Sequence, residues 1–271
     1  MKILVQNPKE PILEGITQVL TTIKEELIIW DGKIPLNDLL DRYNPELTIC
    51  YGGIKSRPKL KLVIVGDYIP YGNINPDLIC VPPHHISSDK HLVIETAANF
   101  THHNIQYDKN YATDLFYYSH NTTPDILEYL VEIEKQYQLK IIGQHRLPIF
   151  SYLGVGTTDD IVKFMKSCKI ALVFDLPSLY TYAANKIFCL TNQENDFFPV
   201  FSSVDILKEH IDSHLNDKLV LQSDNMVIEE AYDIVVHNHT YFHRTHDIFT
   251  RLGYHEQAEQ CLIQLQNIIK T

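Results

Sequence analysis

The residues best suited to binding an anion follow an apolar run in the second half of the chain. Phe174–Tyr180 joins that run to a helical pattern. The first N–H groups of a helix lack partners within the helix, and the helix dipole adds partial positive charge there. A phosphate group could therefore rest on Ser178, Leu179 and Tyr180. An ordinary strand-to-helix turn with Ser178 as its cap fits the same residues.

A second polar group follows the apolar pair Ile141–Ile142. Gln144 and Arg146 come directly after this pair, at the expected carboxyl end of a strand. The guanidinium fork of an arginine matches the oxygens of a phosphate, so Arg146 is a candidate phosphate ligand. A solvated loop arginine is the alternative.

Candidate proton acceptors lie in the first half of the chain. Asp67 follows the apolar run Leu62–Val65, Glu95 follows Leu92–Ile94, and His85 belongs to a histidine pair. A histidine with a pKa near neutrality, or a positioned carboxylate, suits the removal of a proton from a hydroxyl group. Each of these three side chains is equally compatible with a solvated loop, and nothing in the spacing selects one.

The spacing of His239, His243 and His246 would place three imidazoles on one face of a helix. No HExxH pattern accompanies them, and apolar residues give the same helix a face that packs. We therefore expect a packed helix and no metal site. The sequence also has no P-loop, nucleophile elbow or complete GxGxxG, which argues against hydride transfer and the usual phosphoryl transfer.

Composition narrows the class of protein. The 271 residues are 45% hydrophobic and 21% charged, as in ordinary globular proteins, and the formal net charge is −11. An acidic net charge argues against nucleic acid binding, which uses many Lys and Arg side chains to neutralise phosphate groups. The five cysteines form no CxxC pair, no signal peptide is visible, and no apolar run approaches a membrane span. We expect reduced thiols in a cytoplasmic protein.

The order of apolar runs predicts an α/β fold. In the first half, strands are expected at 3–5, 26–30, 47–51, 60–65, 78–81 and 91–95, with helices at 11–23 and 35–43. A second series has strands at 113–118, 140–143, 170–174 and 186–190, with helices from 124, at 161–168, 204–215 and 224–236. Such alternation builds parallel sheets covered by helices. Two Rossmann-like domains with a ligand cleft between them, at the carboxyl ends of the strands, are expected.

Several fragments of the second half occur in an order typical of one enzyme family. They are Ile141–Gly143, Tyr152–Gly154, Phe164–Phe174, Tyr182–Thr191, Asp196–Phe198, and a closing His239–Tyr241 with Arg244 and Leu252–Gly253. In this order they resemble the nucleotide-sugar-binding half of GT-B glycosyltransferases, most closely the CgeB-like family named after a spore-maturation protein. The likeness covers roughly the C-terminal half of the chain.

The resemblance implies a GT-B-like fold and metal-independent transfer of a sugar from a nucleotide-diphosphate donor, with a UDP-sugar favoured and no cofactor. It places the donor in the second half, on Gln144, Arg146, Gly154 and the segment 178–180. A glycan or protein acceptor would lie in the first half, which would supply the base. The implied domains are 1–110, 111–253, and a final helix at 254–271 that crosses back to the first. A homodimer is compatible with this picture.

The chain also departs from the family. Where the family has a glutamate and a glycine in its donor-contacting helix, Tyr180 and Asn185 stand here. A tyrosine can exchange a hydrogen bond but supplies no carboxylate. This departure leaves open the alternative of a catalytically degenerate GT-B protein that binds or assembles. A nucleotide-sugar epimerase-like enzyme is a further alternative, although the sequence shows no carboxylate set for that reaction.

Overall fold

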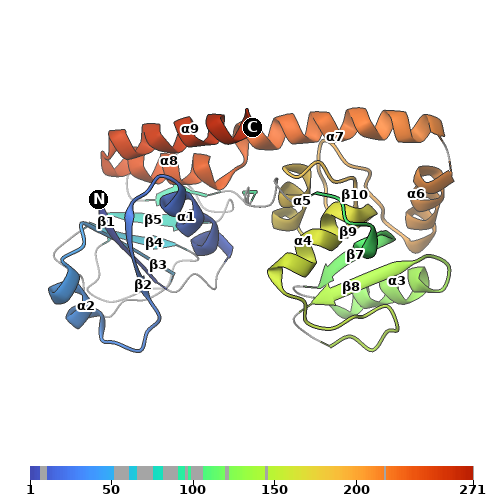
Figure 1. Cartoon of the computed structure of the whole chain (residues 1–271), viewed down its shortest axis with the longest axis horizontal. Coiled ribbons are helices and arrows are strands. Elements are labelled where there is room, and N and C mark those ends of the chain that lie inside the picture. Colours follow the sequence, from blue (N-terminus) through green and yellow to red (C-terminus); the bar gives the residue numbers. More distant parts are fainter. Residues whose placement is uncertain are drawn as a thin grey trace. The chain divides into compact units, whose positions relative to one another are not determined.

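The computed structural model describes residues 1–6, 11–51, 61–65, 76–81, 91–94, 97–98, 106–119, 122–143, 146–216 and 218–270. The chain divides into two compact units (Figure 1). Unit 1 combines Met1–Ala97 with His239–Thr271, and unit 2 is Ala98–Asn238. From the sequence, the domain boundaries were expected after residues 110 and 253. The structure divides the chain after residues 97 and 238, so the larger difference is at the second boundary, before α8 (Tyr241–Leu252).

Unit 1 is built on a parallel sheet. Its strands are β1 (Lys2–Gln6), β2 (Glu26–Trp30), β3 (Leu47–Tyr51), β4 (Lys61–Val65), β5 (Leu78–Val81) and β6 (His91–Val93), in the order β2-β1-β3-β4-β5-β6. Two helices connect the first three strands, α1 (Pro11–Thr22) and α2 (Leu36–Tyr43). The chain moves from β1 to β2 on one side and then returns to β3 on the other, which is the doubly wound topology that the sequence predicts.

Apolar periodicity explains how these elements pack. Helix α1 buries residues three or four apart, such as Leu13, Ile16 and Leu20, against the sheet. On α2, Leu36 and Leu39 join a buried cluster with Leu4 and other strand residues. Central strands whose side chains are buried on both faces read as continuous apolar runs, which is the pattern expected of a parallel sheet.

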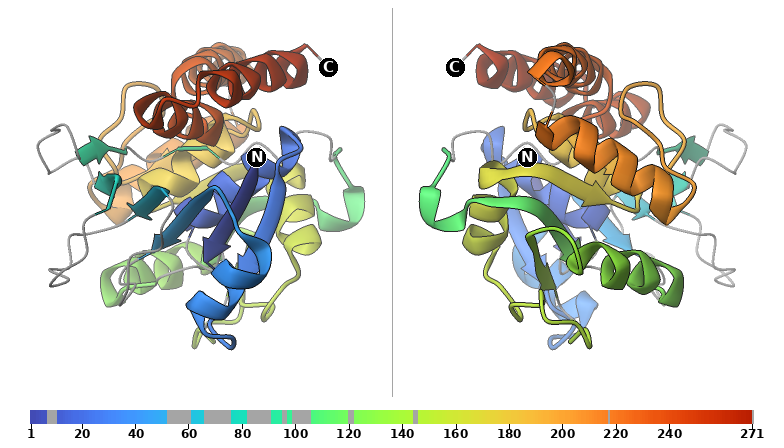
Figure 2. Two further views of the ribbon diagram at one scale, coloured as in Figure 1. Left: turned by 90° about the vertical axis from the view of Figure 1, so that its left-hand side faces the viewer. Right: turned by 90° about the vertical axis from the view of Figure 1, so that its right-hand side faces the viewer.

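The C-terminal helices α8 (Tyr241–Leu252) and α9 (His255–Ile269) complete unit 1 (Figure 2). They pack against each other, and α8 also packs against α1. The closest approach is at Gly15, where an added Cβ would lie 2.1 to 2.4 Å from ring atoms of Tyr241. Helix α8 therefore packs closely on α1 at Gly15, where a side chain larger than that of glycine would meet the Tyr241 ring.

The end of α8 is fixed by its own cap. Gly253 has φ +79°, and the N–H of Tyr254 donates to the Phe249 carbonyl at 2.8 Å, closing a left-handed turn that favours glycine. The Lys61 ammonium donates to the Leu252 carbonyl and lies 4.4 Å from the Tyr254 ring centre. A cation at a helix C-terminus stabilises the last carbonyl groups.

Unit 2 holds a second parallel sheet. Its strands are β7 (Thr113–Ser119), β8 (Leu139–Gly143), β9 (Cys168–Val173) and β10 (Cys189–Thr191), in the order β10-β9-β7-β8. The helical elements are η1 (Lys109–Tyr111), α3 (Pro124–Glu134), α4 (Thr158–Ser167), α5 (Leu176–Ala183), α6 (Val204–Asn216) and α7 (Lys218–Asn238). Aromatic rings of Phe174, Phe201 and Tyr129 pack together against this sheet.

The predicted strand at 186–190 is wrong at its start, since β10 begins at Cys189. Lys186 has φ +56° and its N–H donates to the Ala183 carbonyl, so this residue closes the turn after α5. Asn185, which stands at the family's glycine, does not have a positive φ. The left-handed position, where a glycine is favoured, therefore lies one residue later.

This placement predicts opposite responses at two adjacent residues. We expect Lys186→Gly to be about 1 kcal/mol more stable to unfolding than Lys186→Ala, because both lose the Glu229 ion pair and only alanine keeps the left-handed strain. The same comparison at Asn185 should favour alanine. Urea unfolding of the four variants checks this, and equal stability of the two Lys186 variants would contradict it.

None of the helices within the described residues is long and apolar enough to cross a membrane. All five cysteines are free thiols, and four of them are buried. Burial raises the pKa of the Cys50 thiol to about 12, which makes it unreactive.

Candidate functional site

The topology of unit 2 points to one edge of its sheet. The chain passes from β7 to β8 on one side and then crosses to β9 on the other side of β7. In open parallel sheets, ligands bind outside the carboxyl ends of the strands at such a switch point. The residues that end β7 and β9, together with those that follow them, therefore define the candidate site.

Three hydroxyl groups gather where β7 ends. The Thr122 hydroxyl lies 3.2 Å from that of Tyr117 and within hydrogen-bonding distance of the Ser119 hydroxyl. The ring of Tyr117 meets that of Phe174, which follows β9, edge to face at 5.4 Å. Burial raises the pKa of Tyr117, and the negative charge of Asp175 adds to this rise. The ends of β7 and β9 thus lie side by side, with the hydroxyl groups at the end of β7.

The loop after β8 carries Gly154 and Arg146. The Gly143 N–H donates to the Gly154 carbonyl at 3.2 Å, and the Tyr152 hydroxyl donates to the Gly143 carbonyl at 3.0 Å. Gly154 has φ +111°, a conformation that favours glycine. Arg146 is exposed in the same loop. Across the segments 120–123, 144–157, 174–175 and 192–203, which follow the four strands, it is the sequence's only lysine or arginine.

The N-terminus of α5 is occupied by the chain itself. The Asp175 carboxylate accepts the Ser178 N–H at 2.8 Å, and the Asp175 carbonyl accepts the Leu179 N–H at 3.1 Å. Pro177 has no N–H. The open donors that the sequence analysis expected at Ser178 and Leu179 are therefore already bonded within this cap. Tyr180 lies further along, with its ring 6.2 Å from that of Phe197.

The structure separates the predicted binding residues into two groups. Arg146 and Gly154 lie on the β8 side of β7, whereas Ser178, Leu179 and Tyr180 lie on the β9 side. Gln144, Asp67, His85 and Glu95 lie outside the described residues. In the sequence, the last three follow β4, β5 and β6 respectively.

Sequence reasoning missed Ser119, Thr122 and Asp175. Ser119 and Thr122 stand five and two residues before the predicted helix start at 124, and Asp175 stands two residues before a proline and three before Ser178. Aspartate before such a pair is a helix N-cap signal. That signal was available in the sequence, but the position of β9 beside β7 was not.

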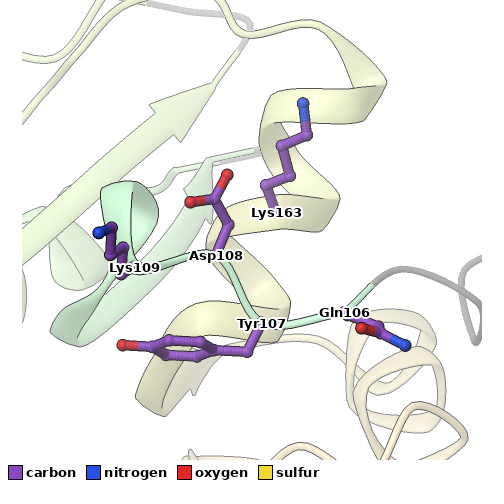
Figure 3. Close-up of a pocket in the computed structure, with 5 residues that line it drawn as sticks. All are labelled: Gln106, Tyr107, Asp108, Lys109 and Lys163. Atoms are coloured by element: carbon purple, nitrogen blue, oxygen red, sulfur yellow. The ribbon is translucent and has the colours of Figure 1, made fainter.

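A pocket of about 560 Å³ lies elsewhere in unit 2 (Figure 3). Its lining consists of Gln106, Tyr107, Asp108, Lys109 and Lys163. Four of these residues immediately precede β7 and so lie at the amino end of that strand. Because ligands of parallel sheets bind at the opposite edge, we place the candidate site at the switch point and not in this pocket.

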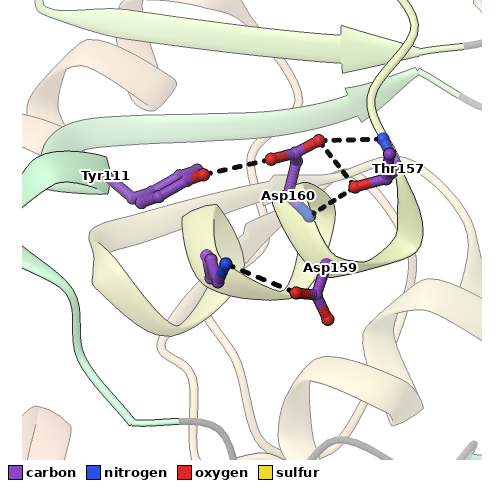
Figure 4. A network of polar contacts seen from close by, with 5 residues as sticks. Tyr111, Thr157, Asp159 and Asp160 are labelled. Atoms are coloured by element: carbon purple, nitrogen blue, oxygen red, sulfur yellow. Dashed lines mark hydrogen bonds and ion pairs between the residues drawn. The ribbon is translucent and has the colours of Figure 1, made fainter.

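A polar network holds the start of α4 in place (Figure 4). The Asp160 carboxylate accepts the Thr157 N–H at 3.0 Å and the Tyr111 hydroxyl at 3.1 Å, and the Asp160 N–H donates to the Thr157 hydroxyl at 3.2 Å. The hydrogen bond from the Thr157 hydroxyl is the main reason that the pKa of Asp160 is lowered. These bonds form a capping box, so Asp160 is accounted for by helix structure.

The histidines in α8 and just before it are likewise accounted for by helix structure. Nδ1 of His243 accepts the Thr240 N–H at 3.3 Å and lies 2.8 Å from the Thr240 hydroxyl oxygen. His239 contacts Arg244, and His246 contacts Asp247. Burial is the first cause that lowers the pKa of His243, to about 4. No group of three metal-ligating side chains occurs within the ranges that the structure describes.

This cap predicts a pH-dependent loss of stability. The unfolded chain binds a proton at His243 near pH 6.5 and the folded chain only near pH 4, so stability should fall as the pH drops through this window. Glutamine can make the same capping bond without titrating. Between pH 7.5 and pH 5, we expect His243→Gln to lose about 1 kcal/mol less unfolding free energy than the wild type, allowing for solvent screening.

Urea unfolding at the two pH values measures this difference. The exposed His255, replaced by glutamine, is the control for the histidine-to-glutamine change itself. An unchanged pH dependence in His243→Gln would refute the assignment.

Comparison with known proteins rests on structure alone, since no family model and no curated protein sequence matches the chain. Among solved structures, a putative UDP-N-acetylglucosamine 2-epimerase from Listeria monocytogenes superimposes with a TM-score of 0.57 and 10% identity, covering 94% of this chain and 96% of that one. The spinosyn forosaminyltransferase SpnP gives 0.53 and 9% identity over 94% and 98% of the two chains.

A UDP-bound MnaA from S. aureus also matches, with a TM-score of 0.53 and 10% identity over 85% of this chain and 91% of that one. The chain has a GT-B-type fold. Identity near 10% shows the fold and no more, so the CgeB-like resemblance stays a prediction.

Proposed function

We propose that this protein is a GT-B enzyme that binds a nucleotide-sugar donor at the carboxyl edge of the unit 2 sheet. The observation that carries the proposal is the switch point between β7 and β9, in a fold shared with nucleotide-sugar enzymes. The proposed reaction is glycosyl transfer from a nucleotide diphosphate, with a UDP-sugar favoured, to a glycan or protein acceptor. We place it in the cytoplasm, and a homodimer is compatible with it.

The proposed chemistry is displacement at the anomeric carbon of the donor sugar. The acceptor hydroxyl loses a proton as its oxygen forms the new bond, and the nucleotide diphosphate leaves with the bonding electrons. Arg146 would stabilise the negative charge that develops on the leaving group. Asp67, His85 and Glu95 remain the candidates for the base. With a guanidinium in this role, the proposed transfer needs no metal ion.

A second candidate is nucleotide-sugar epimerisation. It is favoured by the named epimerases among the structures that superimpose on this chain. The two reactions have different products, because transfer or hydrolysis releases UDP, whereas a simple epimerisation returns an isomerised sugar still attached to it. A catalytically degenerate binding protein is the third reading, and the Asp175 cap over the α5 N-terminus favours it.

The first test is binding of the full chain to UDP, GDP, ADP, CDP and TDP, followed by thermal unfolding. A ligand present at a hundredfold excess over its dissociation constant adds about 2.7 kcal/mol of stability. We expect UDP to give the largest shift. Incubation with UDP-N-acetylglucosamine, followed by chromatography, then distinguishes free UDP from an isomerised sugar nucleotide. A flat response to every nucleotide would overturn the proposal and leave the degenerate protein as the better description.

A further inference from the structure

The carboxyl edge of the unit 2 sheet is electrically asymmetric. On the β9 side, the Asp175 carboxylate stands at the first turn of α5, and on the β8 side Arg146 is exposed in the loop. Strand β7 lies between β8 and β9, with its hydroxyl cluster at the end. A dianionic ligand crossing this edge would meet opposite charges at its two sides.

The start of α5 would ordinarily attract a phosphate. Here the Ser178 N–H is bonded to the Asp175 carboxylate at 2.8 Å and the Leu179 N–H to the Asp175 carbonyl at 3.1 Å. Pro177 offers no donor, so only the Leu176 N–H of this first turn lies outside the cap. The full negative charge of a carboxylate also exceeds the partial charge of about half a unit at a helix N-terminus.

In addition to burial, the negative charge of Asp175 raises the pKa of Tyr117, so the Asp175 carboxylate lies close to the end of β7. Phe174 directly before it contacts the Tyr117 ring at 5.4 Å, which brings the ends of β9 and β7 together. Asp175 itself is exposed, so its charge acts on whatever ligand enters there. Aspartate is one of several residues that can cap a helix, and asparagine or serine would do so without a charge. The charge is therefore not needed for the cap.

We propose that Asp175 is a specificity-determining residue that excludes phosphate from the N-terminus of α5. The diphosphate of a bound nucleotide is thereby directed toward the β8 loop and Arg146. This inference rests on the proposed function, because it concerns the orientation of a nucleotide at that same edge. It runs against the expectation from sequence that Ser178, Leu179 and Tyr180 hold the diphosphate.

The test compares Asp175→Asn with the wild type by calorimetric titration with UDP, inorganic pyrophosphate and uridine. Asparagine keeps the capping acceptor and removes the charge. We expect UDP and pyrophosphate to bind about five- to tenfold more tightly to the variant, as expected for removing one like charge a few ångströms away. Uridine has no phosphate, and its affinity should not rise. Unchanged or weaker binding of UDP and pyrophosphate would overturn the inference.

Two further variants make the result decisive. Asp175→Ser is a second uncharged cap, and a similar gain would show that the charge is responsible. Asp108→Asn is the matched control, because Asp108 caps η1 through the Asn110 N–H at 2.9 Å at the opposite edge of the sheet. It should leave all three affinities unchanged. If Asp108→Asn raised the affinity for UDP and pyrophosphate as much as Asp175→Asn does, the change in net charge alone would explain the effect. That result would overturn the inference.

The proposed function and this inference fail in different ways. Absence of UDP binding to the wild type argues against the proposed function. The inference is then decided by pyrophosphate alone, since Asp175→Asn should bind it measurably more tightly than the wild type does. If neither protein binds pyrophosphate, the inference is overturned as well.

Discussion

Gly15→Ala is expected to destabilise unit 1 by about 2 kcal/mol or more, despite placing a better helix former inside α1. In an open helix, this change would stabilise by up to about 1 kcal/mol. Here the new Cβ would lie 2.1 Å from a ring carbon of Tyr241, which is buried with 7% of its surface exposed. The ring must leave its place or α8 must move away from α1. Thermal unfolding should therefore show a lower midpoint by several degrees.

Two comparisons isolate the Gly15 contact. Thr21→Ala, at an exposed position of the same helix, should leave the stability nearly unchanged. Tyr241→Leu removes the opposing ring, so alanine at position 15 should destabilise that background much less than the wild type. If Gly15→Ala were as stable as the wild type, the packing of α8 on α1 would be wrong.

Most strands of the two sheets could be predicted from sequence because they are short apolar runs between polar segments, although the start of β10 was predicted three residues too early. Leu47–Tyr51 and Lys61–Val65, for example, lie within one residue of the runs chosen from the sequence. Parallel order followed from strand-helix alternation. The order of the strands in each sheet could not be predicted from the periodicity. A connection of a given length can place the next strand on either side of the preceding strand.

The unit against which α8 packs could not be predicted from the sequence, for a related reason. Helix α7 ends at Asn238 and α8 begins at Tyr241, so the helical pattern is almost continuous across the division between the units. Amphipathic spacing shows which face of α8 is buried but not against what. The close contact of Tyr241 with Gly15, more than two hundred residues earlier in the chain, is not visible in that pattern.

The candidate site shows the same limits at the level of single residues. Arg146 was expected from the sequence as a phosphate ligand or a solvated loop residue; the structure shows that it is exposed, and its role stays a prediction. The N-terminus of α5 was expected as a set of open donors, but the residue one position before the helix had not been considered as their partner. A helix cap is a local feature, so Asp175 could have been predicted to bond Ser178. Its place beside Tyr117 could not.

Arg146→Ala is expected to weaken UDP binding by about 10- to 100-fold, the loss usual for one hydrogen-bonded charge pair with a phosphate. Arg146 is the only lysine or arginine among the loops that follow the unit 2 strands, so no neighbouring cation in them can replace it. Arg146→Lys should recover part of the affinity, since it restores the charge without the planar fork. Uridine, which has no phosphate, should bind all three proteins alike. Calorimetric titration measures these affinities.

Lys169→Ala is the matched control for charge. Lys169 is exposed in the same unit, near the amino end of β9, where it pairs with Asp114 at 2.7 Å. Removing it changes the net charge as Arg146→Ala does, but at the edge of the sheet where no ligand is expected. Its UDP affinity should equal that of the wild type. Equal losses in both variants would indicate a general electrostatic attraction, whereas a loss confined to Arg146→Ala, with uridine unaffected, would locate the diphosphate at the β8 loop.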